Sequence, residues 1–494
     1  MVTHTRRILA SRFNKRPLGV RSSSCSAARA GACKVISLAP TVVQTDSASS
    51  STSEGIWGRS YRLLTVGLIL TVGAGAFEAL AVATTLPATI NDLGGLSLYG
   101  WAFSAFMLAN LIGITVAGAE ADRRGPAVPF VAGVTLFALG LVLAGLAPAM
   151  IVVIVGRAIQ GSGAGVISSV AYAAIGRGYP ESLKPRMLAV ISSAWVVPGL
   201  VGPALAGLVS DHLGWRWVFL ALAPLPPIAA ILATPAMRRL GSGSGAPRDW
   251  AQIGTSVRLA VGAALLVTGL GLGTPALAIA IALVGVVLGL PALRRLLPEG
   301  SLRAAPGLPA AIATMGLLSL AFFGVDAFVP LALTAVRGQT ATAAGLALTA
   351  ATMTWTTGSW IQAQLALRTS RRRLVVIGLA LIGAGIALIG ATLLPWVPPL
   401  MGTVAWGLAG LGMGLAFSTL SLVMLETAPS GQEGAASAAL QLANVLGIAL
   451  GTGFGGVIIG YASASAGIAI QSLLMIGVTA LAVAAASRLH RRPG

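Results

Sequence analysis

The chain has 494 residues, of which 56% are hydrophobic and only 9% are charged, and its mean hydropathy is +0.89. Soluble domains have about 25% charged residues, so this composition excludes an ordinary soluble protein and indicates an integral membrane protein. The net charge of +19 is spread over connecting segments without interleaved aromatic residues, which argues against a nucleic-acid-binding patch.

Residues 1–58 form a basic segment that we expect to be a disordered tail. It is rich in Ser and Ala, has no acid before Asp46 and lacks the long apolar core of a secretory signal. An extension from a misassigned start site and an Arg- and Ser-rich transit peptide are the alternatives. The only cysteines, Cys25 and Cys33, lie in this tail, so we expect neither a disulfide framework nor a Cys metal site in the fold.

From Arg62 onward the sequence is a succession of apolar segments of about 18 to 28 residues, each long enough to cross a hydrocarbon core of about 30 Å as a helix. Alternating strands are absent, so the pattern predicts helices rather than a barrel, and it leaves no room for a sizeable soluble catalytic domain. The fourteen segments cover residues 62–88, 98–118, 127–147, 150–177, 188–210, 215–236, 256–273, 275–293, 309–334, 343–364, 374–394, 399–425, 434–460 and 466–487.

Basic residues are concentrated in every second connection. If the turn at 122–124 faces the cytoplasm, that side carries most of the arginines, whereas the opposite connections carry only Arg216 and Arg337. This asymmetry follows the positive-inside rule. An even number of crossings then places both termini in the cytoplasm. We therefore expect a multi-pass protein of the plasma membrane, which in a bacterium is the inner membrane.

The first six and the last six segments form a weak internal repeat. "AFEALAVATTLP" in the first segment resembles "GVDAFVPLALTA" in the ninth, with Glu78 opposite Asp326. Many secondary transporters are built from duplicated helix sets, with the substrate site near the membrane midplane between the repeats. The repeat predicts two six-helix bundles related by a pseudo-two-fold axis, at residues 59–238 and 307–494. Residues 239–306 are then a linker with two extra transmembrane helices, which are short, Gly-rich and separated only by "GTPA".

Three charged residues lie well inside apolar segments and away from their ends, where lipid penalises them: Glu78, Arg157 and Asp326. Intramembrane charges are functional candidates by default. Burial disfavours the ionised form of a carboxyl group, so both acids are candidates for gaining and losing a proton. The simpler alternatives are a static ion pair of Glu78 with Arg157, a structural pairing of Asp326, and an Arg157 side chain that extends to the membrane interface.

Glycine-rich motifs accompany these charges. "GAEADRRG" offers Asp122 to a basic group or a helix N-terminus, and its glycines permit a tight turn, although a solvated turn would have the same composition. In "VPGLVGPALAGLVS" Pro203 cannot donate a hydrogen bond to Gly199, so we expect a bend there, and small residues at 202, 206 and 210 predict close helix packing. "RAIQGSGAG" mimics a phosphate-binding loop, but no strand precedes it and no Lys follows.

The order of these motifs resembles the major facilitator superfamily, specifically its fourteen-helix proton-antiporter branch of drug exporters, over roughly residues 60–488. "VPGLVGPALAG" looks like the antiporter signature of that branch. "FEALAVATTLP" is similar to its first-helix motif, in which an acid stands nine residues before a Pro, here Glu78 and Pro87. The chain departs from the family at Pro126 and Ala127, which replace a basic pair, at Leu80, which replaces Thr, and in having Glu rather than Asp in the first helix. The second-half copy of the loop, "LALRTSRRRL", has lost both glycine and acid.

The resemblance implies proton-coupled export by alternating access, with the proton as coupling ion and no other cofactor or metal. Together with the two acids inside helices, it gives three groups of candidate residues. These are Glu78, Asp326 and Arg157 for proton coupling, Gly118, Asp122, Arg123 and Gly125 for a cytoplasmic gating loop, and Gly199, Gly202, Pro203 and Gly207 for a hinge in the fifth helix.

A pocket between the halves is expected to be lined by aromatic and amide side chains. The candidates are Trp101, Phe106, Gln160, Trp195, Phe323, Trp355, Gln441 and Asn444, although aromatic residues in membrane helices also pack or anchor at interfaces. The expected partner is a lipophilic small molecule carried by a monomer. An uptake symporter or a lipid exporter of the same fold stays open, and the paired acids disfavour a non-transporting scaffold. The absence of hydrolase, metalloprotease and Cys-cluster motifs argues against an enzyme.

Overall fold

The computed structural model describes residues 55–489, apart from 181, 242–244, 246–248, 367 and 430–431. The expected tail up to residue 54, with Cys25 and Cys33, therefore lies outside the described residues. All regular secondary structure in the described part of the chain is helical, and twelve of these helices are long and apolar enough to cross a membrane. This confirms an all-α membrane protein.

The helices that precede the linker are called the first helix set. Its members are α1 (Arg62–Leu93), α2 (Tyr99–Arg124), α3 (Ala127–Gly145), α4 (Met150–Gly178), α5 (Lys184–Ser193), α6 (Val196–His212), α7 (Trp215–Leu222) and α8 (Leu225–Arg239). The fifth and sixth apolar segments are thus each divided into two helices. The linker forms a hairpin of α9 (Trp250–Leu270) and α10 (Pro275–Leu296), and both of these helices are among the twelve.

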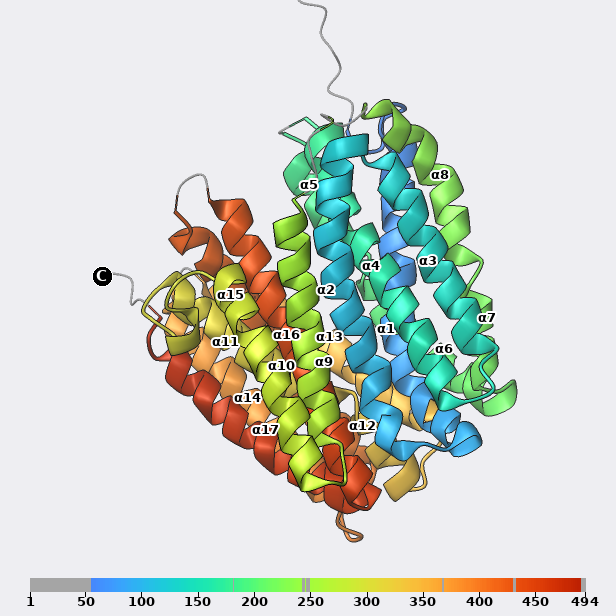
Figure 1. Ribbon diagram of the computed structural model, residues 1–494, viewed down its shortest axis with the longest axis vertical. Coiled ribbons are helices and arrows are strands. Elements are labelled where there is room, and N and C mark those ends of the chain that lie inside the picture. Colours follow the sequence, from blue (N-terminus) through green and yellow to red (C-terminus); the bar gives the residue numbers. More distant parts are fainter. Residues whose placement is uncertain are drawn as a thin grey trace, which may run out of the picture. The chain divides into compact units, whose positions relative to one another are not determined.

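The helices that follow the linker are called the second helix set. Its members are α11 (Leu308–Asp326), α12 (Val329–Leu331), a π-helical turn (Ala332–Val336), α13 (Ala341–Leu365), α14 (Arg371–Thr392), α15 (Leu400–Thr427), α16 (Glu433–Tyr461) and α17 (Ala464–Ala486). Figure 1 shows these helices packed beside the first set, with the hairpin of α9 and α10 in front of both.

Two of the fourteen expected segments are not among the twelve apolar helices. The segment at 188–210 is interrupted at Ala194 and Trp195, which leaves α6 only 17 residues long. The segment at 343–364 is α13, a 25-residue helix in which Thr, Ser and Gln are mixed with apolar residues. This helix packs between α6 and α15, so its hydroxyl and amide groups do not all face lipid.

Each helix set has its own apolar core, and the two cores meet. The core of the first set is joined by Ala327 and Phe328 of the second. The core of the second set is joined by Ala83 of α1. Helix α1 and the turn that follows α11 therefore contribute to the contact between the sets.

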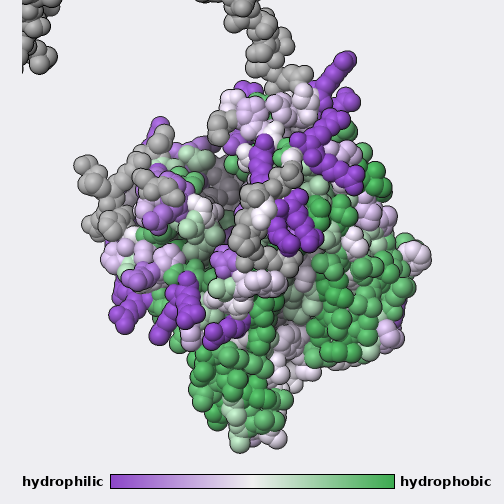
Figure 2. Space-filling view, turned by 45° about the horizontal axis from the view of Figure 1, so that its top comes forward, coloured by the Kyte–Doolittle hydropathy of each residue, from purple (hydrophilic) through white to green (hydrophobic). Residues whose placement is uncertain are grey.

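Hydrophilic side chains gather at the end of the molecule where α2, α4 and α8 finish, and apolar side chains cover the flanks below it (Figure 2). This arginine end carries Arg124, Arg177, Arg238 and Arg239, all of them exposed. The opposite end, where α1 finishes and α2 begins, is called the far end. The uneven placement of arginine predicted from the sequence therefore corresponds to one face of the folded chain.

Candidate functional site

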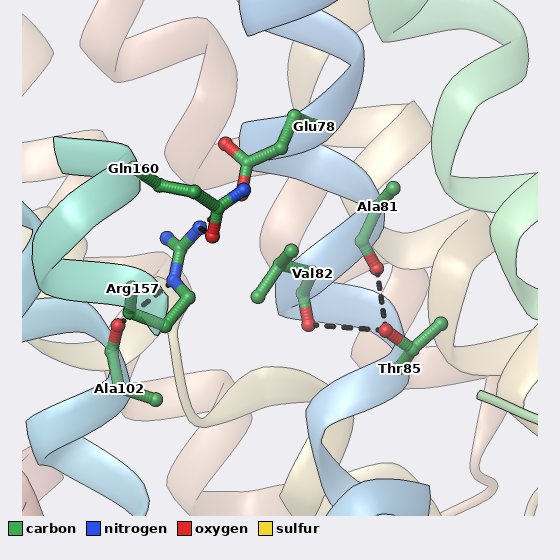
Figure 3. Close-up of polar contacts among 7 residues, drawn as sticks. All are labelled: Glu78, Ala81, Val82, Thr85, Ala102, Arg157 and Gln160. Carbon is green, nitrogen blue, oxygen red and sulfur yellow. Dashed lines mark hydrogen bonds and ion pairs between the residues drawn. The ribbon is translucent and has the colours of Figure 1, made fainter. Parts of the chain in front are cut away.

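An ion pair enclosed between α1 and α4 forms the centre of the candidate site. Glu78 lies near the middle of α1 and Arg157 in the first half of α4, with exposed fractions of 0% and 2%. Nη1 of Arg157 contacts Oε1 of Glu78 and donates a second hydrogen bond, 3.2 Å long, to Oε1 of Gln160. The Gln160 amide donates in turn to Oε1 of Glu78 at 3.3 Å, so the three side chains form a closed triangle (Figure 3).

Helix α2 holds the rest of the guanidinium group. Nε of Arg157 donates to the carbonyl oxygen of Ala102 at 3.0 Å (Figure 3). The guanidinium also lies over the ring of Phe106, 4.2 Å from its centre. A desolvated cation over an aromatic face is stabilised by about 2 kcal/mol. These contacts keep Arg157 in the interior, so it does not extend to the membrane interface. The ion pair with Glu78, the simpler alternative for that acid, is the arrangement seen.

The glycines of α4 allow α2 to approach closely enough for these contacts. A Cβ atom on Gly161 would lie 2.0 Å from the carbonyl oxygen of Phe106, and one on Gly165 would lie 2.2 Å from that of Asn110. Only residues without a side chain permit such contact between helix backbones. The "GSGAG" sequence therefore serves helix packing around Arg157.

Glu78 keeps one oxygen without a partner. Oε2 is fully enclosed, and none of the residues that the structure describes donates a hydrogen bond to it. An enclosed acceptor without a donor costs about 1–3 kcal/mol. A proton on Oε2 would turn this oxygen into a hydroxyl group and leave Oε1 to accept from Arg157 and Gln160. The arrangement can therefore hold the Glu78 carboxyl group with or without a proton.

The second acid has a different setting. Asp326 is half-buried at the last residue of α11, and its Oδ1 accepts a hydrogen bond of 2.6 Å from the indole Nε1 of Trp406 on α15. Pro330 helps to explain why the helix ends there, because it has no amide hydrogen for the Asp326 carbonyl. Within the described part of the chain no hydrogen bond or ion pair joins Asp326 to Glu78 or Arg157. The two acids that the repeat placed opposite each other therefore differ in both partner and position.

Aromatic rings gather beside Asp326. Trp406 is completely buried and stacks on Phe322 with ring centres 4.9 Å apart. The rings of Phe323 and Trp355 are centred 6.2 Å apart, and both are half-buried. The structure thus brings together two of the expected pocket residues, from α11 and α13, next to the half-buried acid.

A polar pair lies between α11 and α16. The Ser319 hydroxyl donates to Oδ1 of Asn444 at 2.7 Å, and the Asn444 amide reaches Oε1 of Gln441 at 3.5 Å. Gln441 is exposed and Asn444 is half-buried. These two expected pocket residues are neighbours, and one of them also links two helices of the second set.

The other expected pocket residues are scattered. Phe106 and Gln160 are enclosed around the ion pair, with exposed fractions of 6% and 0%. Trp101 is half-buried on α2, and Trp195 is exposed at the interruption between α5 and α6. An apolar groove of about 540 Å³ lies elsewhere, between α3 and the bend from α7 to α8, and contains none of the expected residues.

The expected gating loop begins later than its sequence suggested. Helix α2 continues to Arg124, so Gly118 and Asp122 are helical, and only Gly125, with φ of +82°, makes the turn. Asp122 forms an ion pair of 2.7 Å with Arg177 at the end of α4, which confirms that the acid meets a basic group. Nη1 of Arg123 lies 3.9 Å from Oε1 of Glu120, one turn earlier in α2.

The fifth segment is interrupted before α6 begins, not within that helix. Helix α6 runs through Pro203 without interruption, and the break occurs before the helix begins, at Ala194 and Trp195. Pro198 in the first turn of α6 fits this position, because the first amides of a helix have no carbonyl partner within it. The bend predicted at Pro203 therefore stays a prediction, and the interruption at Ala194 and Trp195 is one that the sequence did not indicate.

The small residues of α6 do make the close contact that was expected. A Cβ atom on Gly199 would lie 2.1 Å from Cγ2 of Thr352, and one on Gly207 would lie 2.5 Å from Cα of Thr342. Both contacts are with α13. Gly202 faces the ring of Phe77 on α1 at an ordinary distance of 3.6 Å. Helix α6 thus joins the first helix set to the second.

Side chains at the start of α2 also join the two sets. The Tyr99 hydroxyl donates to the carbonyl oxygen of Ala327 at 2.7 Å, and the Ser104 hydroxyl donates to that of Ala449 at 2.8 Å. Tyr99 and Ser104 are completely buried. Sequence reasoning missed both, because a hydroxyl group in an apolar helix does not by itself reveal a partner far along the chain.

Asp211 makes the third polar link between the sets, again at the far end. Its carboxylate accepts hydrogen bonds from the amides of Ala341 and Thr342, at 3.1 and 3.0 Å, and from the Thr342 hydroxyl at 2.7 Å. The acid of α6 therefore caps the first turn of α13, where the helix dipole favours negative charge. Only the position of Asp211 at the end of α6, the helix rich in small residues, could have indicated this role.

Comparison with known proteins gives the family of this fold. Residues 66–452 match the profile of the Major Facilitator Superfamily. A protein of Mycobacterium tuberculosis named "Probable multidrug-efflux transporter" is 29% identical over 451 residues, which cover 86% of this chain and 93% of that one. The multidrug transporter protein MdtP of Bacillus subtilis is 26% identical over 404 residues, which cover 78% of this chain and 73% of the other.

Solved structures agree at the level of the fold. A POT family transporter in complex with 5-aminolevulinic acid has a TM-score of 0.65 at 14% identity, covering 87% of this chain and 96% of that one. A bacterial homolog of the human lysosomal transporter Spinster, inward-facing and unoccupied, has a TM-score of 0.59 at 16% identity, with coverages of 87% and 96%. The chain is a membrane transporter, not an enzyme, and it belongs to the major facilitator superfamily, as its motifs predicted.

Proposed function

We propose that the chain is a proton-coupled exporter of lipophilic small molecules that works by alternating access. The names of its sequence relatives support drug efflux as the direction and class of transport. The aromatic rings beside Asp326 suit a substrate with a large apolar body. The coupling ion is the proton, and no metal or organic cofactor takes part.

The observation that carries this proposal is the enclosed carboxyl group of Glu78, in which Arg157 contacts one oxygen and no residue in the described part of the chain donates a hydrogen bond to the other. Removing one partner of an enclosed ion pair costs about 3–5 kcal/mol, so the charges of the two residues are strongly linked. Adding a proton to Oε2 neutralises the acid and leaves Arg157 with an uncompensated charge. This uncompensated charge then favours a rearrangement of α1 and α4, the helices that carry the two residues.

The contacts between the two helix sets give the direction of that rearrangement. Tyr99, Ser104 and Asp211 tie the sets together at the far end. In the proposed cycle this is the state closed to the outside. Protonation of Glu78 and release of the substrate accompany opening of the far end, and Asp326 acts as a second acid that the substrate or a proton occupies.

The proposed topology has fourteen transmembrane helices. The interrupted pair of α5 and α6 and the more polar α13 would cross the membrane with the twelve apolar helices, because α13 lies between α6 and α15. The arginine end would face the cytoplasm of a bacterial inner membrane together with both termini. A monomer suffices, since one chain supplies both helix sets.

Everted membrane vesicles test the function directly. With an imposed pH gradient, wild-type vesicles should accumulate a lipophilic cationic dye, and Glu78→Gln should lower the pH-driven rate at least tenfold while the protein remains in the membrane. The matched control is Glu426→Gln, which removes an acid that pairs with Arg371 at 2.7 Å outside the candidate site. Dye accumulation that does not respond to the gradient, or an E78Q variant with wild-type rate, would refute proton coupling through Glu78.

A further inference from the structure

The linker hairpin has no part in the proposed transport site, yet it occupies a definite place. Helices α9 and α10 pack on each other through glycine, since a Cβ atom on Gly262 would lie 2.6 Å from Cα of Gly289. The outer helix is exposed, with fractions of 68% at Ile279 and 62% at Val287. Exposed apolar side chains are compatible with the hydrocarbon core of the membrane, so α10 faces the lipid and α9 faces the protein.

Helix α9 lies over the seam where α2 of the first set meets α16 of the second (Figure 1). Three of its small or apolar residues are almost fully enclosed there. They form one cluster with two residues of α2, three of α16 and one of α10, consisting of Leu259, Ala260 and Ala263 with Leu108, Leu111, Val445, Leu446, Ala449 and Ala292. One helix of the hairpin therefore contacts both sets along the line at which they would have to part.

The attachments of α9 to the two sets differ in kind. The Thr115 hydroxyl of α2 donates to the Ser256 hydroxyl of α9 at 3.0 Å. On the other side Val445 and Leu446 of α16 meet α9 through apolar side chains. Breaking a hydrogen bond where no water can replace it is unfavourable, whereas apolar surfaces lose little when one slides over the other in lipid.

The other seam between the sets, where α6 meets α13, has no inserted helix over it in the described part of the chain. Apolar side chains on both helices stay exposed there, with fractions of 67% at Val197 and 71% at Trp360. The two sides of the molecule are therefore unequal. The hairpin covers one of them.

We propose that the α9–α10 hairpin is a lateral seal that keeps acyl chains out of the α2–α16 seam, and that it moves with α2 while α16 slides beneath α9. The claim that the hairpin moves with α2 rests on the proposed function, because it needs the two helix sets to move. The claim that the hairpin is a lateral seal does not depend on that function.

Two disulfides separate movement with α2 from movement with α16. In a Cys25→Ser/Cys33→Ser background, T115C/S256C would tie α9 to α2. G271C/V457C would tie α9 to α16, since a Cβ atom on Gly271 lies 3.6 Å from Cγ2 of Val457. After oxidation we expect dye export to stay within twofold for the first pair and to fall at least tenfold for the second, with recovery in reductant. The opposite order, or equal effects, would overturn the proposal that the hairpin moves with α2.

The seal itself is tested without transport. A Cys in place of Leu446, which is 8% exposed beneath α9, should react at least tenfold more slowly with a lipid-soluble maleimide than a Cys in place of Val197. Shortening Leu259 to Ala should speed the reaction at position 446 several-fold. Equal labelling of the two sites would contradict a seal. If the Cys-free background exports no dye, the proposed function fails, and the labelling result still decides the seal.

Discussion

At the scale of single residues, the ion pair of Glu78 and Arg157 has both a structural and a proposed functional role, and the two can be separated. Arg157→Met leaves an enclosed carboxylate without its cation, which should cost about 3–5 kcal/mol of stability. The double variant E78Q/R157M removes both charges and should recover most of that loss. We expect a lowered melting temperature for R157M, near wild-type melting for the double variant, and no pH-driven export by either. Export by the double variant would contradict the proposed role.

Asp326 allows a second prediction at this scale. Its carboxylate accepts from Trp406, and Asp326→Asn keeps an acceptor oxygen in the same place. Stability should therefore change by less than about 1 kcal/mol. Export of a cationic dye should fall severalfold, because the charge facing the aromatic rings is lost. The ratio of the rates for a cationic and a neutral dye, compared between D326N and wild type, measures this effect, and an unchanged ratio would exclude a role for the charge.

Sequence reasoning succeeded with residues that are unusual for their surroundings. A carboxyl group and a guanidinium group inside apolar segments identified Glu78 and Arg157 before any contact was known, because lipid makes such residues expensive. It could not identify Trp406 or Tyr99, since an indole or a phenol in a membrane helix is ordinary. Their importance comes from partners on other helices, and pairing at such distances along the chain leaves no local pattern.

At the scale of helices, the cap that Asp211 places on α13 gives a prediction about the far end. Asp211→Ala removes three hydrogen bonds to the first turn of α13. Loss of a cap costs about 1 kcal/mol, which corresponds to about a fivefold shift between closed and open arrangements. A reporter Cys at Ala206, which is 2% exposed, should then react about fivefold faster with a water-soluble maleimide.

The matched control for this prediction is Asp249→Ala. Asp249 caps α9 by accepting from the amide of Gln252 at 3.0 Å, but it does not link the two helix sets. The Asp249→Ala variant should lower the stability of α9 by a similar amount without changing the reaction of the reporter Cys at position 206. Equal acceleration by both variants would mean that general loosening, not release of the far end, exposes the reporter.

Helix positions were predictable because hydropathy and segment length follow from the thickness of the membrane. The interruptions were not. Helix α6 continues through Pro203, whereas the break falls at Ala194 and Trp195, which the local sequence does not mark. At the interruption after Asp326, Pro330 lacks the amide hydrogen that would continue the helix, and Tyr99 of another helix donates a hydrogen bond to the carbonyl oxygen of Ala327. Local sequence could reveal only the proline, not the hydrogen bond from Tyr99.

At the scale of the whole molecule, the simplest form of the proposed cycle exchanges the single proton of Glu78 for one substrate molecule. With a monovalent cation as substrate this exchange moves no net charge, so only the pH gradient drives it. One pH unit supplies about 1.4 kcal/mol, enough for about a tenfold dye gradient. In potassium-loaded vesicles, nigericin should therefore abolish dye accumulation, whereas valinomycin should leave it nearly unchanged. Inhibition by valinomycin would show that charge crosses the membrane and would require a different stoichiometry.

The bond from Tyr99 to Ala327 has one further consequence. The carbonyl that it satisfies is next to the Asp326 carboxyl group, and its donor comes from the other helix set. When the sets separate at that end, this oxygen loses its phenol and must take a water molecule instead, because an unsatisfied carbonyl is too costly to leave dry. Opening would thus bring a water molecule to Ala327, the residue next to Asp326. The same motion that separates the helix sets would then also supply a path for protons from the outer solution.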